Sequence, residues 1–288
     1  MSAMSEVVGS VVIVGGVGLA FAVFIALAYG KLYVWEDPRV EAVTAMLPGS
    51  NCGACGLPGC LGFAQKAVAG EVQPSGCNVL NDEGAAAIAA FLGVEAGAIN
   101  KKVARLLCAG GTNVAVQQAD YRGLETCAAA ATVAGGGKGC TWGCLGFGDC
   151  AAVCDFDAIR MNEFGLPVVD IPKCTACGDC VDGCPKDLFT IMPLDQRLIV
   201  QCRSLIEGDA ALAECAVACT ACGKCVVDAA PGLIHMERGL AVIDYEKNAL
   251  ATRDATRRCP TDAIVWVEGA QFASQRPAEP AAQVRMSA

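Results

Sequence analysis

Twenty cysteines against a single histidine, in a chain of 288 residues, constrain the fold more than any other feature of this sequence. Cysteine at this density is typical of a disulfide scaffold, of zinc sites or of iron-sulfur clusters, and the spacing decides among them. Aromatic residues make up only 6% of the chain, so we expect small cores that are cross-linked by bound metal groups. The net charge of −9 argues against a nucleic-acid partner, which would need a basic surface.

Residues 7–29 carry no charge and are numerous enough to cross a hydrocarbon core of about 30 Å as a helix. This run predicts a single-pass membrane anchor in segment 1–34. A cleaved signal peptide would carry basic residues before the apolar run, but the charged residue found there is Glu6. Lys31 and Arg39 follow the run, so the positive-inside rule predicts an anchor in the cell inner membrane with the bulk of the chain on the cytoplasmic side. That compartment is reducing, which argues against disulfides.

Segment 35–95 is predicted to be a small helical 4Fe-4S domain. Cys52, Cys55 and Cys60 form a C-x2-C-x4-C loop, and Cys77 is the candidate fourth ligand. Glycines 53, 56 and 59 allow the backbone to come close to a cubane cluster. A zinc ribbon would more typically show two C-x2-C pairs. A helix is expected over residues 61–72.

Segment 96–138 is rich in alanine and broken by glycines, which favours a helical linker. Cys108 and Cys127 lie there without a C-x2-C partner, and we interpret both as small buried apolar residues. Lys138 is followed by Gly139, so the glycine-rich run at 135–139 does not fit a phosphate-binding loop.

Segment 139–196 is predicted to be a two-cluster domain like that of bacterial ferredoxins. Its second half reads C-x2-C-x2-C-x3-C-P, a run in which the fourth cysteine binds the other cluster. Applied to both halves, this rule gives two ligand sets: Cys140, Cys144, Cys150 and Cys184; and Cys154, Cys174, Cys177 and Cys180. The first half departs from the common short spacing at its first two cysteines. A β-hairpin is expected over residues 156–173 and a strand over 187–193.

Segment 197–270 resembles the preceding unit but lacks half of its cysteines. Asn248, Ala251 and Asp254 stand where a second C-x2-C-x2-C run is expected, and residues 229–231 replace its C-P partner. One cluster is therefore expected in this degenerate unit. By the same rule its ligands are Cys219, Cys222, Cys225 and Cys259.

Three residues near this unit have other predicted roles. Cys215 could replace Cys219 or Cys222, because it mirrors Cys140 of the preceding unit. Cys202 is interpreted as structural, and His235 as a residue of a strand. The tail, residues 271–288, has no periodicity and is expected to be disordered.

The order of these segments resembles the B subunit of the Rnf complex, the ion-translocating ferredoxin:NAD⁺ oxidoreductase, over nearly the whole chain. Residues 33–60 and 140–159 carry the resemblance. It implies an electron-transfer subunit that takes electrons from reduced soluble ferredoxin toward NAD⁺, in a translocase that moves Na⁺ or H⁺. The partners it implies are the other membrane and peripheral subunits. No flavin-attachment motif or G-x-G-x-x-G is found, so we expect this chain to bind neither flavin nor NAD and to contain no catalytic residues.

The sequence therefore predicts an α+β chain with one transmembrane helix and four 4Fe-4S clusters. Two other functions are compatible with the residues. One is a membrane-anchored polyferredoxin that serves another reductase, and the other is a structural zinc-binding scaffold.

Overall fold

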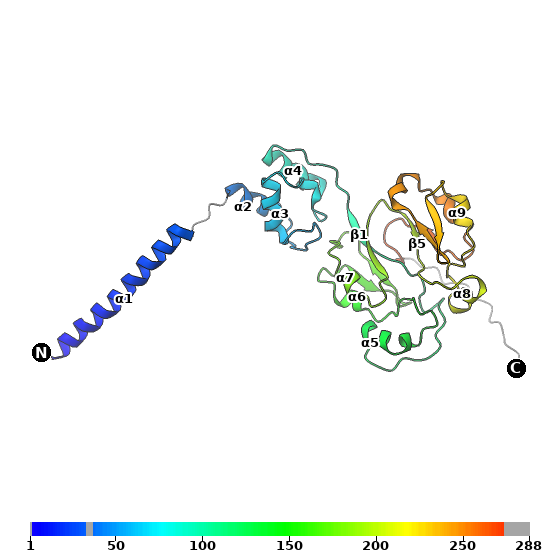
Figure 1. Ribbon diagram of the computed structural model, residues 1–288, viewed down its shortest axis with the longest axis horizontal. Helices are drawn as coiled ribbons and strands as arrows, with labels where there is room; N and C mark the ends of the chain where they lie inside the picture. Colours follow the sequence, from blue (N-terminus) through cyan, green and yellow to red (C-terminus); the bar gives the residue numbers. More distant parts are fainter. Residues whose placement is uncertain (1, 33–36, 274–288) are drawn as a thin grey trace.

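The computed structural model of the chain describes residues 2–32 and 37–273, and it combines short helices with two-stranded sheets (Figure 1). Residue 1, residues 33–34 of the predicted anchor and residues 274–288 of the predicted tail lie outside the described residues. The mixture of helices and strands agrees with the predicted α+β class.

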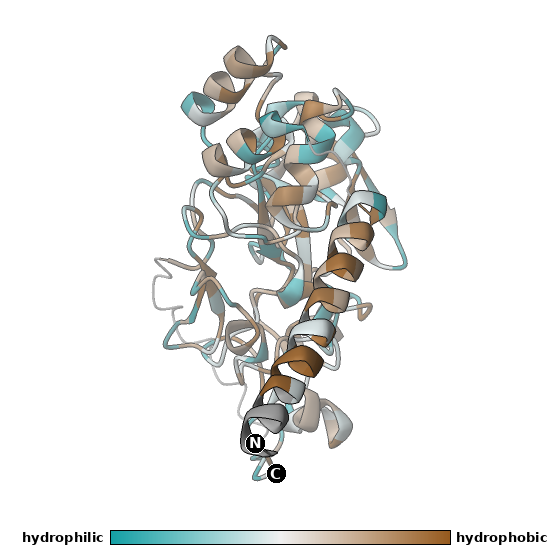
Figure 2. Cartoon of the chain, turned by 90° about the vertical axis from the view of Figure 1, so that its left-hand side faces the viewer, coloured by the Kyte–Doolittle hydropathy of each residue, from teal (hydrophilic) through white to brown (hydrophobic). Residues whose placement is uncertain are grey.

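The first helix, α1 (Ser2–Leu32), is apolar along most of its length (Figure 2) and extends away from the other elements (Figure 1). Within the described residues, one helix is long and apolar enough to cross a membrane, and its span is Val11–Leu32. None of that span is buried against the rest of the protein. At 1.5 Å per residue its 22 residues match the thickness of a hydrocarbon core.

A helical unit follows, made of α2 (Pro38–Met46), α3 (Gly59–Val68), the 3-10 turn η1 (Pro74–Gly76) and α4 (Asp82–Leu92). Val43, Phe63 and Ile88 from its three α-helices form a buried apolar core. Helix α3 begins two residues before the predicted helix over 61–72 and ends four residues earlier. Gly70, with φ of +76°, ends the helical path at that point.

Two antiparallel pairs form the next unit. Strands β2 (Ile159–Met161) and β3 (Pro167–Val169) pair with Ile159 opposite Val169, as the predicted hairpin requires. Strand β4 (Phe189–Pro193) pairs with β1 (Lys102–Leu106). The short helices α6 (Asp149–Ala152) and α7 (Asp179–Asp182) connect the strands.

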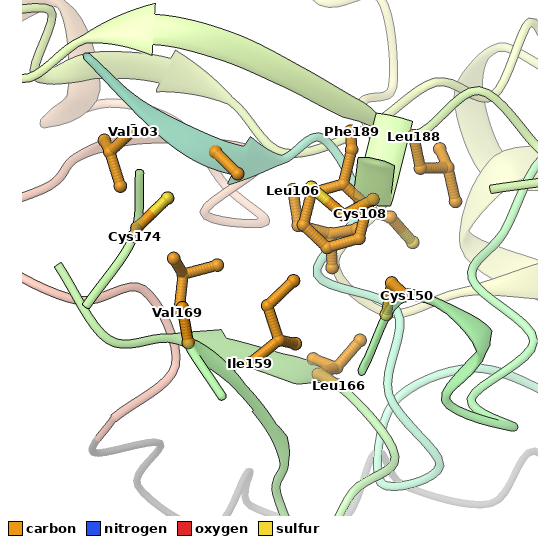
Figure 3. Packing of buried hydrophobic residues seen from close by; sticks show 13 residues of the cluster. Val103, Leu106, Cys108, Cys150, Ile159, Leu166, Val169, Cys174, Leu188 and Phe189 are labelled. Carbon is orange, nitrogen blue, oxygen red and sulfur yellow. The ribbon is translucent and has the colours of Figure 1, made fainter. Parts of the chain in front are cut away.

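Strand β1 contradicts a purely helical linker over residues 96–138. Val103, Ala104 and Leu106 are all buried in it, because β4 lies on its edge and the core of the unit covers it. The short helix α5 (Cys127–Thr132) and the 3-10 turn η2 (Ala134–Gly137) are the helical parts of this segment. Figure 3 shows Val103 and Leu106 together with Leu188 and Phe189 in that core.

The last unit repeats this arrangement. Strands β5 (Leu198–Val200) and β8 (Ile264–Trp266) pair at its ends, and β6 (Ile234–Glu237) pairs with β7 (Leu240–Ile243). His235 lies in β6 as predicted. Helices α8 (Gly208–Glu214) and α9 (Lys224–Asp228) and the 3-10 turns η3 (Tyr245–Leu250) and η4 (Arg253–Thr256) complete the unit.

Where the second cysteine run is missing, apolar side chains pack against one another instead. Ala251 and Ala255 pack into its core with Tyr245, whose hydroxyl donates to the Leu198 carbonyl at 3.0 Å. The missing half is therefore a packed core rather than a cavity lined by cysteines.

The first residues of the predicted disordered tail are ordered. Gln271 is buried, and its side-chain amide bonds both the N–H (3.0 Å) and the carbonyl (3.1 Å) of Leu106 in β1. The carbonyl of Gly269 accepts a 2.8 Å bond from Arg105 of the same strand. The prediction is wrong at residues 271–273 because the end of β1 is a partner that the local sequence does not reveal.

Candidate iron-sulfur sites

The four cysteines predicted for the N-terminal domain lie around one loop. Cys55, Cys60 and Cys77 pack against the core of the helical unit, and the pKa of Cys77 is raised by burial and further by the neighbouring Cys52 and Cys55 thiolates. Asn51 fixes the loop, because its Oδ1 accepts the Cys60 N–H at 2.8 Å. The structure therefore brings this predicted set together.

Four cavities of similar size, about 320 to 400 Å³ including open solvent, are each lined by four cysteines. The four sets are Cys154, Cys174, Cys177 and Cys180; Cys219, Cys222, Cys225 and Cys259; Cys127, Cys144, Cys150 and Cys184; and Cys108, Cys140, Cys202 and Cys215. With the N-terminal set, each of the twenty cysteines occurs once. The first two cavities contain the residues that the sequence groups together.

The third cavity differs from the prediction in one residue. Cys127, rather than Cys140, lines it with Cys144, Cys150 and Cys184. The carboxylate of Asp149 causes this, because it accepts the Cys127 N–H at 2.7 Å and the Ala128 N–H at 2.9 Å and so holds the start of α5 beside α6. Cys140 instead lines the fourth cavity, and Cys215 lies there rather than in the position of Cys219 or Cys222.

The loops around the cavities contain residues in the left-handed backbone conformation, which neither a right-handed helix nor a strand contains. Gly148, Gly178 and Gly223 precede α6, α7 and α9 with φ of +84°, +105° and +69°. Ala176 and Ala221, inside the two Cys-Thr-Ala-Cys loops, have φ of +63° and +59°. These left-handed residues turn the chain around each cavity.

The degenerate unit retains a turn that follows a cysteine elsewhere in the repeats, although no cysteine precedes the turn here. Asp157, Asp187 and Asp262 each follow a cysteine by three residues and have φ of +48° to +53°. Gly232 occupies the same place after Ala229 and has φ of +74°. The backbone therefore agrees with the alignment in which residues 229–231 replace the C-P pair, with Ala229 in the place of the cysteine.

Backbone N–H groups are directed at many of these sulfurs. The N–H of the residue two places later, Val79, Gly146 or Asp179, lies near the Cys77, Cys144 or Cys177 thiol and lowers its pKa. Such N–H groups favour a thiolate over a thiol and are typical of sulfurs that bind iron. The residues around the cavities therefore fit a cysteine-bound cluster.

Burial, with a smaller contribution from neighbouring thiolates, raises the pKa of Cys144, Cys150 and Cys180 to about 12. As free side chains these groups would stay protonated at neutral pH. Metal ligation requires the thiolate, so iron binding at these sets must release protons. The arrangement suits several iron ions among four sulfurs, whose positive charge offsets the mutual repulsion of the thiolates.

A single chelated ion fits this geometry less well. Across residues 2–32 and 37–273, no three His, Cys, Asp or Glu side chains form a group that could hold one metal ion. Tetrahedral zinc requires sulfurs about 2.3 Å from a common centre. The cysteines instead surround cavities, which favours cubane clusters over a zinc scaffold.

A fifth cavity is of another kind. It lies between β4 and β7, has a volume of about 890 Å³ including open solvent, and has one cysteine, Cys202, in its wall. It therefore lacks the ligands of a cluster site.

These features define an iron-sulfur electron-transfer protein with one candidate membrane helix. A family model for an Fe-S cluster domain (FeS) matches residues 47–79, the segment that contains the N-terminal set. Four cysteines remain after the four predicted ligand sets are complete. This surplus was the signal in the sequence that could have indicated a further set.

Three curated relatives match most of the chain. The B subunit of the Na⁺-translocating ferredoxin:NAD⁺ oxidoreductase complex of Acetobacterium woodii is 43% identical, over 88% of this chain and 75% of the relative. The B subunit of the ion-translocating oxidoreductase complex of Methanosarcina acetivorans is 35% identical, over 90% and 98%. The B subunit of the proton-translocating ferredoxin:NAD⁺ oxidoreductase complex of Clostridium ljungdahlii is 35% identical, over 97% and 99%.

The chain belongs to the family of B subunits of ion-translocating oxidoreductase (Rnf) complexes. It therefore has an electron-transfer role in an oxidoreductase complex of several subunits and is associated with a membrane.

Proposed function

We propose that this chain takes electrons from reduced ferredoxin and passes them toward NAD⁺, while the complete complex moves Na⁺ or H⁺ across the membrane. The names of the relatives from A. woodii and C. ljungdahlii support the donor and acceptor, and they differ in the ion. The other subunits would hold the flavin and nicotinamide sites. In this chain 4Fe-4S clusters, when bound, supply one-electron carriers.

The observation that carries the proposal is the repeated cavity lined by four cysteines. Three of these cavities, beside α6, α7 and α9, are each bounded by a loop with left-handed residues and by a short helix that begins beside a cysteine. The proposed ligand sets are Cys52, Cys55, Cys60 and Cys77; Cys127, Cys144, Cys150 and Cys184; Cys154, Cys174, Cys177 and Cys180; and Cys219, Cys222, Cys225 and Cys259.

The two middle sets lie close together because their loops are exchanged. Cys154 follows α6 but lines the cavity of Cys174, and Cys184 follows α7 but lines the cavity of Cys150. The Cys150 thiol is near enough to Cys180 of the other set for that thiolate to raise its pKa. Adjacent sets of this kind suit the transfer of single electrons better than an isolated structural site.

The same proposal includes a single-pass anchor in the cell inner membrane with the cysteine-rich units in the cytoplasm. Lys31 in the last turn of α1 and Arg39 after it are the basic residues that support this orientation. Protease treatment of inverted vesicles should digest the cysteine-rich units, and intact cells should protect them. Digestion in intact cells only would reverse the orientation.

Electron transfer can be tested in inverted vesicles that contain the complete complex. Cys222→Ala should remove a ligand of the C-terminal set and abolish ferredoxin-dependent NAD⁺ reduction. Val227→Ala is the matched control, because this side chain lies in α9 beside the same site and is 77% exposed. Copurification of the other subunits would verify assembly of both variants.

Unchanged NAD⁺ reduction by an assembled Cys222→Ala complex that lacks the C-terminal cluster would contradict this route. Loss of activity in both variants would point to damage of α9 rather than to the thiolate.

A further inference from the structure

The fourth cavity collects four cysteines from four separate loops. Cys108 follows β1, Cys140 follows η2, Cys202 follows β5 and Cys215 follows α8, and all four line one cavity of about 400 Å³. Cys108, Cys202 and Cys215 are buried, and Cys140 is half-buried. No short sequence motif connects them, since the nearest pair is separated by twelve intervening residues.

Their sulfurs face a common space. A Cβ added at Gly110 would lie 3.3 Å from Cys215 Sγ and 3.5 Å from Cys108 Sγ, so both sulfurs flank this glycine. The cysteines that lie near the Cys215 thiol are Cys108, Cys140 and Cys202. Each of the three other cysteines is therefore close to it.

Each of the four sulfurs lies near the backbone N–H of the residue two places later. The Gly110 N–H donates to Cys108 Sγ at 3.4 Å, and the N–H groups of Trp142, Ser204 and Val217 lie near Cys140, Cys202 and Cys215. Cys77, Cys144 and Cys177 of the other sets have a backbone N–H in the same place. This pattern at every cysteine of the cavity is the arrangement expected of thiolate ligands rather than of four buried thiols.

The loops that carry these residues are fixed by backbone bonds outside the cavity. The Ala109 N–H donates to the Gln201 carbonyl at 3.0 Å, which joins the Cys108 and Cys202 loops. Ala115 forms a β-bridge with Cys215, and the Gly139 N–H donates to the Val116 carbonyl at 2.9 Å. The four cysteines are thus positioned by the polypeptide itself.

A cation also borders the cavity. The ammonium of Lys138 donates to the carbonyls of Gly110 and, at 2.5 Å, of Cys144, and its side chain lines the cavity. A cubane bound by four thiolates carries net negative charge, which a fixed ammonium would offset.

We propose that Cys108, Cys140, Cys202 and Cys215 bind a fifth 4Fe-4S cluster. All four cysteines are free of disulfides, and no group of side chains in the described part of the chain could hold a single metal ion. The cavity has the same size and the same four-cysteine lining as the three proposed above.

The position of this site gives it a role, which rests on the proposed electron-transfer function. The Cys144 N–H donates to Cys108 Sγ at 3.3 Å, and the Cys219 N–H lies near the Cys202 thiol. A ligand residue of each neighbouring set is therefore close to a sulfur of this one. The fifth cluster would connect the two ferredoxin-like units, which otherwise have no shared cysteine set.

The test is the iron and acid-labile sulfide content of anaerobically purified, reconstituted full-length protein, together with spin integration of the dithionite-reduced EPR signal. The wild type should contain about 20 irons, and Cys202→Ala about 16, since each cubane holds four. Ser204→Ala is the matched control, because Ser204 is buried in the same loop and its backbone N–H remains. It should keep the wild-type content.

Equal iron content in the wild type and Cys202→Ala, near 16 in both, would overturn the fifth site and leave the four proposed sets intact. Zinc that is lost in Cys202→Ala would overturn it too. A wild type without iron would instead remove the proposed function as a whole. If Cys202→Ala fails to fold, Cys140→Ala replaces it, because Cys140 is half-buried and lies in a loop. Retention of all irons in that variant would refute the proposal.

Discussion

The contact between Asp149 and the start of α5 decides which cysteine joins Cys144, and its strength can be measured. The carboxylate accepts two N–H groups, from Cys127 and Ala128, at 2.7 and 2.9 Å. Asp149→Asn keeps one acceptor oxygen and directs an amide N–H₂ at the other donor. One charge-assisted hydrogen bond is lost, which costs about 1.5 kcal/mol, at the low end of the usual range because the site is partly exposed.

That free energy corresponds to roughly a tenfold increase in the population in which α5 opens. Hydrogen–deuterium exchange measured by mass spectrometry, on a peptide that contains residues 127 and 128, should therefore be about tenfold faster in the variant. The control is Asp179→Asn. Asp179 occupies the equivalent position at the start of α7, where its carboxylate lies near the Cys177 side chain.

Unchanged exchange in Asp149→Asn would refute the role of this carboxylate in positioning Cys127. Equal acceleration in Asp179→Asn would show a general loosening of the unit rather than release of α5.

Three other perturbations have definite expected outcomes. Leu188→Ala should lower the free energy of unfolding by about 2–5 kcal/mol in anaerobic urea titrations, because Leu188 is fully buried, whereas Leu212→Ala, at 39% exposure, should change it by less than about 0.5 kcal/mol. Burial raises the pKa of Tyr245 to about 12 from an ordinary value of 10.0, so its neutral form stabilises the fold below pH 10 and this contribution is lost as the pH rises toward 12. The loss should reach about 1 kcal/mol by about pH 11, and Tyr245→Phe should remove this part of the pH dependence; an identical slope in both proteins would contradict the assignment. The third perturbation concerns Arg105, which is buried beside Cys174 with its Nε and Nη2 unpaired. A fixed cation favours the state with one more electron, so Arg105→Met should lower a reduction midpoint in an EPR-monitored titration and Arg105→Lys should raise it again; equal midpoints in all three proteins would refute this.

Several parts of the architecture could be predicted because their signals are local. The apolar run of α1, the hairpin of β2 and β3, and the spacing from Cys174 to Cys184 each lie within a short stretch of chain. The substitution of Ala229 for a cysteine was likewise visible, since the surrounding repeat provides its own reference.

The missed features depend on contacts between distant segments. Strand β1 is a strand because β4 pairs with it some ninety residues later, and Gln271 is ordered because it bonds Leu106. The residues next to β1 in the sequence do not identify β4 as its partner, and those next to Gln271 do not identify Leu106. The sequence over 96–138 therefore suggested helices where a strand had to form.

The order of residues is enough to establish that this chain is rich in thiolate ligands, that runs of them repeat, and that one apolar segment is long enough for a membrane. How the remaining cysteines combine depends on the folded chain, which brings Cys108, Cys140, Cys202 and Cys215 to one cavity and Cys127 to another. The physical reason is that a cluster requires four sulfurs close together in space. Spacing along the chain reveals such a set only when its members come from the same loop.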